Sequence, residues 1–168
     1  MMGCDNNGIE GFPLRMLIIL IVIIMSLPLV YSWFKVYDYN STESNIESEF
    51  KKLSNSIRML YFNGNGRTRV DMDLGSGIFA RLDYAVLGDG VYHNIMTYKI
   101  TEGNKKHVLL EDPYIPIGNL TKNNGETFLL PLRLSSGSYT LILECRNDVD
   151  CDGDGIGDIY INISIGGG

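Results

Sequence analysis

The strongest pattern along the chain is an uninterrupted run of apolar residues near the N-terminus. From Met16 to Phe34 the sequence reads MLIILIVIIMSLPLVYSWF, 19 residues without a charged side chain. A helix of that length, at about 1.5 Å per residue, nearly crosses the roughly 30 Å hydrocarbon core of a bilayer. No face of the run is polar, and aromatic residues gather at its end, where an interfacial belt belongs. We therefore predict a transmembrane helix over 16–34, preceded by a cytoplasmic leader over 1–15.

The next segment, 35–66, changes to the spacing of an amphipathic helix. We expect a short linker, an N-cap at Ser41 or Thr42, and a stop at the turn-forming run Asn63-Gly64-Asn65-Gly66. Apolar residues recur at steps of three and four at Ile46, Phe50, Leu53, Ile57 and Leu60. This stripe packs either on the sheet of its own domain, which we favour, or against neighbouring subunits.

From Arg67 onward the apolar residues alternate with polar ones, which is typical of half-buried strands. Glycine- and asparagine-rich turns separate the segments. The predicted strands are 67–74, 78–87, 91–101, 106–110, 127–134, 138–144 and 158–165. The expected fold is therefore α+β: an N-terminal transmembrane and stalk helix followed by an antiparallel β-sandwich of about seven strands over 67–168.

Composition and charge argue against two classes of function, nucleic-acid binding and catalysis. The 168-residue chain has a formal net charge of −6, and a nucleic-acid binder would show a basic patch instead. Only His93 and His107 are present, each in a predicted strand, and no phosphate loop, zinc-spaced cluster or nucleophile elbow appears. We therefore expect a non-enzymatic protein that does not bind nucleic acid.

Three glycosylation sequons and a close cysteine pair bear on topology. The sequons begin at Asn40, Asn119 and Asn162, all after the apolar run. Cys145 and Cys151 are expected to form a disulfide, which belongs to an oxidising compartment, whereas Cys4 lies alone in the leader. We expect a single-pass cell-membrane protein with an extracytoplasmic C-terminal domain. A cleavable secretory signal is the competing interpretation, with Val30 and Ser32 at positions −3 and −1 of the cut.

The segment Cys145–Asp158 carries the most specific chemistry. Aspartates alternate along it, a glycine follows them, and another aspartate ends the pattern D-x-D-x-D-G-x-x-D. The candidate Ca²⁺ ligands are Asp150, Asp152, Asp154 and Asp158, with Asp148 as an outlying candidate. Ca²⁺ takes 6–8 oxygen ligands, and carboxylates this close repel one another without a cation. The alternative is a solvated acidic turn, since Asp-Gly is also ordinary turn chemistry. The segment resembles the calcium loops of thrombospondin type 3 repeats.

The N-terminal segment resembles archaeal type IV pilin-like proteins. The stretch Gly8-Ile-Glu-Gly-Phe-Pro-Leu-Arg15 precedes the apolar helix as a short polar leader does in that family. The resemblance implies cleavage by a prepilin peptidase after Gly8 or Gly11, and it covers about the first 60 residues. The chain departs from bacterial pilins at Met16, where they carry Glu.

Two functions follow as hypotheses. The first is a pilin-like subunit with a structural or assembly role in a cell-surface filament, contacting the membrane and like subunits through its N-terminal helix. The second is an anchored or secreted β-sandwich binding module that contacts a surface glycan or a partner protein.

Overall fold

A single long helix precedes two β-sheets in this chain. The computed structural model describes residues 7–64, 66–75, 77–91, 93–111, 113–123, 126–149 and 158–166. Its elements are α1 (Asn7–Asn63), β1 (Gly66–Leu74), β2 (Leu82–Asp89), β3 (Ile95–Ile100), β4 (Lys105–Leu109), β5 (Ile117–Asn123), β6 (Glu126–Leu130), β7 (Leu132–Leu134), β8 (Gly137–Val149) and β9 (Asp158–Ile165).

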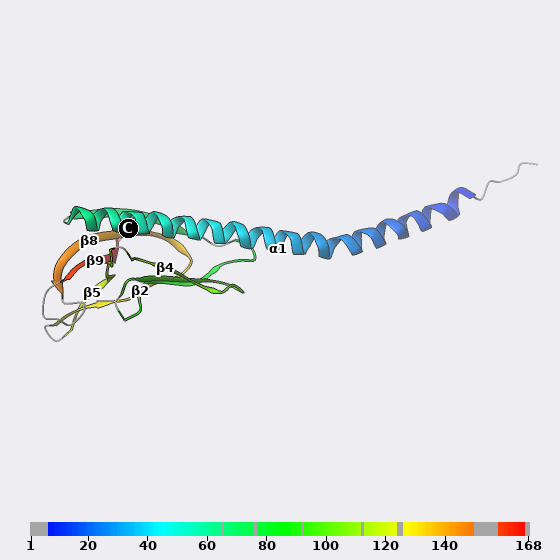
Figure 1. Ribbon diagram of the computed structural model, residues 1–168. Coiled ribbons are helices and arrows are strands. Elements are labelled where there is room, and N and C mark those ends of the chain that lie inside the picture. The colour runs from blue at the N-terminus through cyan, green and yellow to red at the C-terminus, as the bar shows by residue number, and fades with distance from the viewer. Residues whose placement is uncertain are drawn as a thin grey trace, which may run out of the picture.

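The helix α1 is continuous over 57 residues, which corresponds to about 85 Å. Its second half lies along the β-sheets, and its first half extends well beyond them (Figure 1). The predicted linker after Phe34 and the N-cap at Ser41 or Thr42 are therefore wrong. No glycine or proline interrupts residues 35–62. Packing of the apolar stripe outweighs the weak helix propensity of the Asn-Ser-Thr triplet at 40–42.

The strands form a five-stranded sheet in the order β1-β8-β9-β5-β6 and a four-stranded sheet in the order β4-β3-β2-β7. Neighbours pair antiparallel, except that β5 runs parallel to β9. The part of the chain that the structure covers thus has nine strands rather than about seven, and its sheets are not purely antiparallel.

Three differences from the predicted strands have local causes. The strand β5 lies between the predicted strands 106–110 and 127–134, where no strand is predicted. The predicted strand 127–134 divides at Pro131, so that β6 pairs with β5 while β7 pairs with β2 of the other sheet. Proline has no N–H to donate to a ladder, and here the chain crosses between sheets. The strand predicted from Ile78 begins only at Leu82, because the N–H groups of residues 78–80 bind Asp38 instead.

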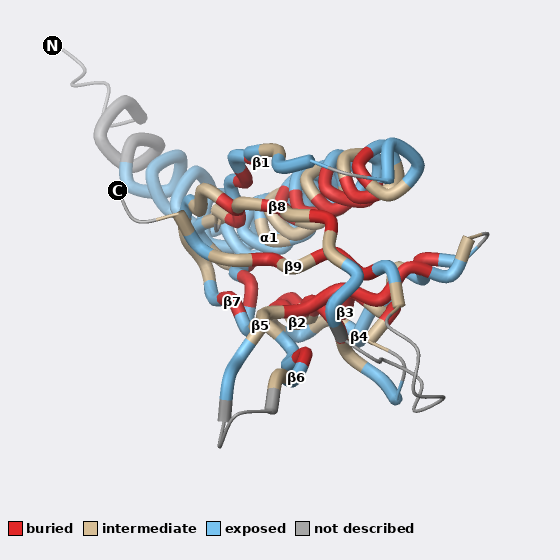
Figure 2. The backbone as a smooth tube through the Cα atoms, turned by 90° about the vertical axis from the view of Figure 1, so that its left-hand side faces the viewer, coloured by how far each residue is buried: buried red, intermediate tan, exposed pale blue. Residues whose placement is uncertain are grey.

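One apolar core joins the helix to both sheets. The stripe residues Ile46, Phe50, Leu53 and Ile57 are fully buried in it. Phe50 contacts Tyr98 of β3, with ring centroids 4.8 Å apart. In Figure 2 the buried positions of α1 face β1, β8 and β9. The stripe therefore packs in its own domain, as favoured from the sequence.

The two sheets lie close together at Gly88 of β2. Its φ is +85°, and a Cβ there would overlap the backbone carbonyl oxygen of Ile117 in β5. The register of β2 against β3 also shifts between Leu87 and Asp89. Only glycine fits this contact, because it has no Cβ and tolerates a positive φ.

Candidate functional sites

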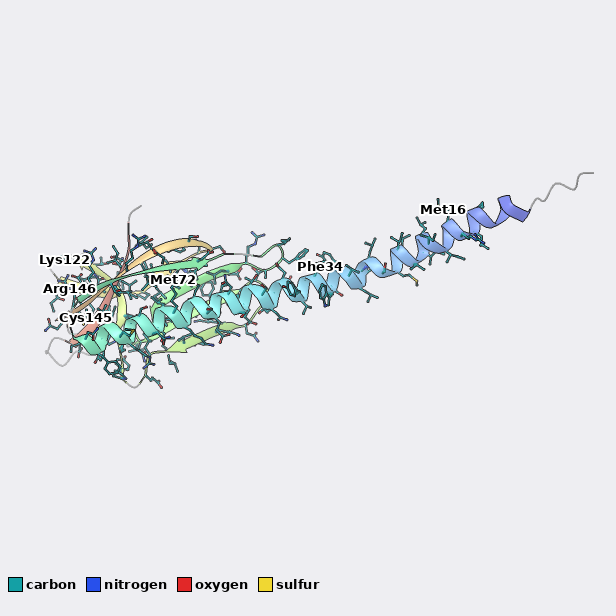
Figure 3. The ribbon with its side chains drawn as sticks, turned by 90° about the horizontal axis from the view of Figure 1, so that it is seen from above. Met16, Phe34, Met72, Lys122, Cys145 and Arg146 are labelled. Atoms are coloured by element: carbon teal, nitrogen blue, oxygen red, sulfur yellow. The ribbon has the colours of Figure 1, made fainter. Side chains whose placement is uncertain are left out.

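Residues 14–34 of α1 form an apolar rod whose side chains are exposed over most of its length. An 18-residue window within residues 13–63 has a mean hydropathy of 2.5 and no buried residue. By length and composition, α1 can cross a membrane. Figure 3 shows Met16 and Phe34 on the part of the helix that lies outside the β-sheets. The exposed large apolar side chains include Leu17, Ile18, Ile19, Leu20, Ile21, Val22, Ile23 and Ile24. A continuous apolar surface of this kind marks an interaction with lipid or with other protein surfaces.

Two serine hydroxyls within this rod donate to backbone carbonyls of the helix itself. Ser26 Oγ donates to the carbonyl oxygen of Ile23 at 3.0 Å, and Ser32 Oγ donates to that of Leu29 at 2.9 Å. Pro13 and Pro28 both lie inside the helix. Pro28 has no N–H to offer, so the backbone around it loses one helical hydrogen bond. Such a break is tolerated in membrane helices when neighbouring groups compensate.

Asp38 joins α1 to the turn before β2. Its carboxylate accepts hydrogen bonds from the backbone N–H groups of Ile78 at 3.1 Å, Phe79 at 2.8 Å and Ala80 at 3.0 Å. The N–H groups of Ala80 and Phe79 hold the pKa of Asp38 below its ordinary value of 3.8. Gly77 lies so close that a Cβ would overlap the carboxylate. Sequence analysis does not identify Asp38, because its donors lie about 40 residues later in the chain.

The turn after β3 meets the same part of the helix. Lys35 Nζ lies 2.7 Å from Glu102 Oε2, and a Cβ on Gly103 would overlap the hydroxyl of Tyr39. The backbone N–H of Thr101 also donates to the carbonyl oxygen of Arg81 at 2.9 Å. The turns at 77–81 and 101–104 are therefore bound to each other and to α1. We call these two turns the rim.

The predicted leader glycines, Gly8 and Gly11, both fall in the first turns of α1. The asparagines of the three predicted sequons lie on three different elements. Asn40 is exposed on α1, whereas Asn119 and Asn162 are half-buried on β5 and β9. The side-chain oxygen of Asn162 accepts the N–H of Leu120 at 2.9 Å. Nothing here tests cleavage or glycosylation, and both stay predictions.

The predicted calcium loop connects β8 to β9. Asp150, Asp152 and Asp154 lie outside the described residues, while Asp158 begins β9 opposite Val149. Among residues that the structure describes, no three His, Cys, Asp or Glu side chains gather as a metal centre. The strands that carry this loop end far from Phe34, at the end marked by Cys145 and Arg146 in Figure 3.

Asp148 is engaged by protein groups at the base of that loop. Arg146 donates to it through Nη2 at 2.7 Å and Nε at 3.2 Å, and the hydroxyl of buried Tyr160 donates at 2.5 Å. These bonds, from Arg146 first and then Tyr160, hold the pKa of Asp148 at about 2. A cation at this carboxylate would have to compete with the guanidinium of Arg146 and the hydroxyl of Tyr160. Arg146 and Tyr160 face each other across β8 and β9, a pairing that the sequence did not reveal.

Cys145 lies on the core side of β8 and is buried. Burial raises the pKa of its thiol. It forms no disulfide within the described ranges, and Cys151, its predicted partner, lies outside them. Val149 is four residues further along the strand, at most about 13 Å away. A bridge needs Cα atoms within about 7 Å, so it requires the chain to turn back directly after Val149.

The two histidines make local contacts. His93 Nδ1 lies 3.0 Å from the carbonyl oxygen of Gly88. His107 Nδ1 lies 3.1 Å from Thr97 Oγ1, which itself donates to Asp89 Oδ2 at 3.0 Å. Since the single proton of Thr97 points to Asp89, His107 Nδ1 must be the donor to Thr97. A base would accept from the hydroxyl, and Thr97 is fully buried, so this trio lacks the arrangement of a nucleophile and its base.

Comparison with models of protein families, with curated proteins and with solved structures finds no match to this chain. Its function is therefore inferred from its own residues.

Proposed function

We propose that this chain is a membrane-anchored, pilin-like surface protein with a structural or assembly role in a cell-surface filament. The observation that carries the proposal is one unbroken helix with two different surroundings. Residues 14–34 expose apolar side chains, whereas the stripe from Ile46 to Leu60 is buried in the β domain. Because the stripe is already covered, the N-terminal half is the part left to contact lipid or other helices.

The proposed topology places the leader in the cytoplasm and the β domain outside the cell. The exposed Asn40 sequon and the predicted Cys145–Cys151 pair support this orientation. In this proposal the two sheets form a sandwich, and the core they share with α1 supports that description. The helix and the domain then behave as one stiff unit.

Like subunits are the proposed partners of the apolar half. An apolar helix gains little from leaving lipid for another apolar helix, so association depends on close packing between the helices. The uncharged surface from Met16 to Phe34 offers no electrostatic barrier to such packing. The same surface can therefore rest in a bilayer before assembly and against neighbouring helices after it.

The mature N-terminus tests this proposal. We expect intact mass and N-terminal sequencing of the protein from its native membrane to show a cut after Gly8 or Gly11. Changing both glycines together, Gly8→Leu with Gly11→Leu, should leave the full-length mass. A cut after Ser32 would make the protein secreted, and an uncut chain would be a plain anchor; either result contradicts the pilin-like role.

We further propose that Asp150, Asp152, Asp154 and Asp158 bind Ca²⁺, with the disulfide closing the same segment. Four carboxylates within nine residues support the cation, since their mutual repulsion disfavours the empty loop. Asp148 is left out of this ligand set because Arg146 and Tyr160 already occupy it.

Differential scanning calorimetry tests the cation. The melting temperature should rise in Ca²⁺ relative to EDTA, and Asp154→Asn should abolish most of that difference. Asp148→Asn is the control: it should lower the melting temperature similarly in Ca²⁺ and in EDTA. An equal melting temperature for the unchanged protein in both solutions rules the metal out.

A further inference from the structure

The turn before β2 presents apolar side chains at the end of the β domain nearest the apolar rod. Ile78 is 85% exposed, and the ring of Phe79 packs edge-on against Tyr31, with centroids 5.2 Å apart. Tyr31 belongs to the predicted transmembrane segment, three residues before its end at Phe34. In Figure 1 the connection between β1 and β2 reaches along α1 toward its apolar half.

Hydrogen bonds hold the turn before β2 in this position. Asp38 holds three consecutive N–H groups of the turn, and Thr101 binds Arg81 from the second turn of the rim. These bonds favour membrane contact, because a side chain that is already held in position loses little further conformational entropy when it enters the bilayer.

Two carboxylates beside the turn are compensated. The Asp38 carboxylate is satisfied by backbone donors, and Glu102 pairs with Lys35 at 2.7 Å. Moving an unpaired charge out of water is costly, whereas paired and hydrogen-bonded groups at an interface avoid most of that cost. The rim is thus suited to the boundary between water and lipid.

The position of the turn along the axis of α1 also agrees with contact to the headgroup region. Tyr31 lies about 4.5 Å along the helix axis inside the end of the predicted span. The headgroup region on each side of a bilayer is about 5–8 Å thick. With residues 16–34 in the hydrocarbon core, Phe79 and Ile78 therefore lie at the level where interfacial apolar side chains settle.

We propose that the rim docks on the bilayer, with Ile78 and Phe79 inserted at the boundary between headgroups and acyl chains. The β domain then rests on the lipid surface before assembly instead of standing away from it on a free stalk. This inference depends on the proposed membrane anchor, but it adds a second lipid contact that the anchor does not require.

Tryptophan fluorescence of the full chain in phosphatidylcholine vesicles tests the docking. The chain has a single tryptophan, Trp33, so the background is Trp33→Phe. One variant adds Ile78→Trp and the control adds Val91→Trp. Val91 is also 85% exposed, but it follows β2 whereas Ile78 precedes it. The strand between them is about 26 Å long.

With brominated acyl chains, we expect the Ile78→Trp protein to lose most of its fluorescence and to emit at shorter wavelength. The Val91→Trp protein should keep its fluorescence. Equal, weak quenching of both, in protein that floats with the vesicles, overturns the docking and leaves the anchor intact. Protein that does not float with the vesicles overturns the anchor and the docking together.

A second measurement uses the unchanged sequence. Photoreactive phosphatidylcholine, with the reactive group in its acyl chain, should label the tryptic peptide 70–81, which contains Ile78 and Phe79. The adjoining peptide 82–99 contains Val91 and is the internal control. Labelling of neither peptide, with label found in the apolar helix, contradicts the docking even if the tryptophan variants misfold.

Discussion

At the scale of single residues, two carboxylates hold opposite ends of the β domain. Asp38 binds the turn at 78–80 near the apolar rod, and Asp148 binds Arg146 and Tyr160 beside the acidic loop. Both accept defined donors, and both have a lowered pKa for that reason. Each acid therefore acts first as a hydrogen-bond acceptor within the fold.

The titration of Asp38 gives the first prediction. A carboxylate whose folded pKa lies below its ordinary value stabilises the fold at neutral pH. That contribution is lost as the pH falls below 3.8 toward the lower folded value. We expect the carboxyl-carbon NMR signal of Asp38 to titrate with a midpoint below 3.8. A midpoint at or above that value contradicts the three hydrogen bonds, and Asp38→Asn should remove this part of the acid sensitivity.

Gly88 gives a second prediction at this scale. Gly88→Ala should lower the free energy of unfolding by about 2–4 kcal/mol, combining a strained positive φ with overlap against a backbone oxygen. Gly90→Ala is the matched control, because the φ of Gly90 is similar at +89°. A Cβ at Gly90 would lie 3.0 Å from Cδ1 of Ile95, which is the end of a flexible side chain. That variant should lose about 1–2 kcal/mol. Equal losses in urea unfolding would show that the sheets do not touch at Gly88.

At the scale of elements, α1 has two environments along one axis. Its N-terminal half is apolar on all sides, whereas its C-terminal half is apolar on one side only, and that side is buried. Ion pairs such as Lys51–Glu47 lie on the opposite, solvated side of this half. The same helix therefore exposes an apolar surface in one half and completes a protein core with the other.

The buried side yields a third prediction. Phe50→Ala should destabilise the β domain by about 3–5 kcal/mol, because Phe50 is fully buried and contacts Tyr98. Met59→Ala is the control on the same helix; Met59 is 68% exposed, and its change should cost no more than about 0.5 kcal/mol. Denaturant unfolding of the detergent-solubilised chain measures both. A small loss for Phe50→Ala would mean that the helix does not complete the core.

At the scale of the whole molecule, the packed β domain should fold without the apolar rod and should be soluble once the rod is removed. A chain that begins at Lys35 keeps Asp38 and the buried stripe, and it loses the Tyr31–Phe79 contact. We expect it to be a water-soluble monomer by sedimentation velocity, with the circular dichroism of a folded β domain. Aggregation or loss of structure would show that residues 1–34 are needed for the fold.

Part of this architecture is readable from the sequence because the governing pattern is local. The apolar run 16–34, the stripe from Ile46 to Leu60 and the alternation from Arg67 each depend only on neighbouring residues. The predicted helix start at Ser41 and strand start at Ile78 are wrong because they also depended only on neighbouring residues. In both places distant partners, the core and Asp38, outweigh local preference.

The sequence alone determined that an apolar segment precedes a β-rich domain. Hydropathy and the periodicity of apolar residues depend only on residues that are close together in the chain. Only the tertiary structure decided that the helix is continuous, that Pro131 divides one strand between two sheets, and that Phe79 meets Tyr31. Those contacts join residues tens of positions apart, and chain topology, rather than local propensity, brings them together.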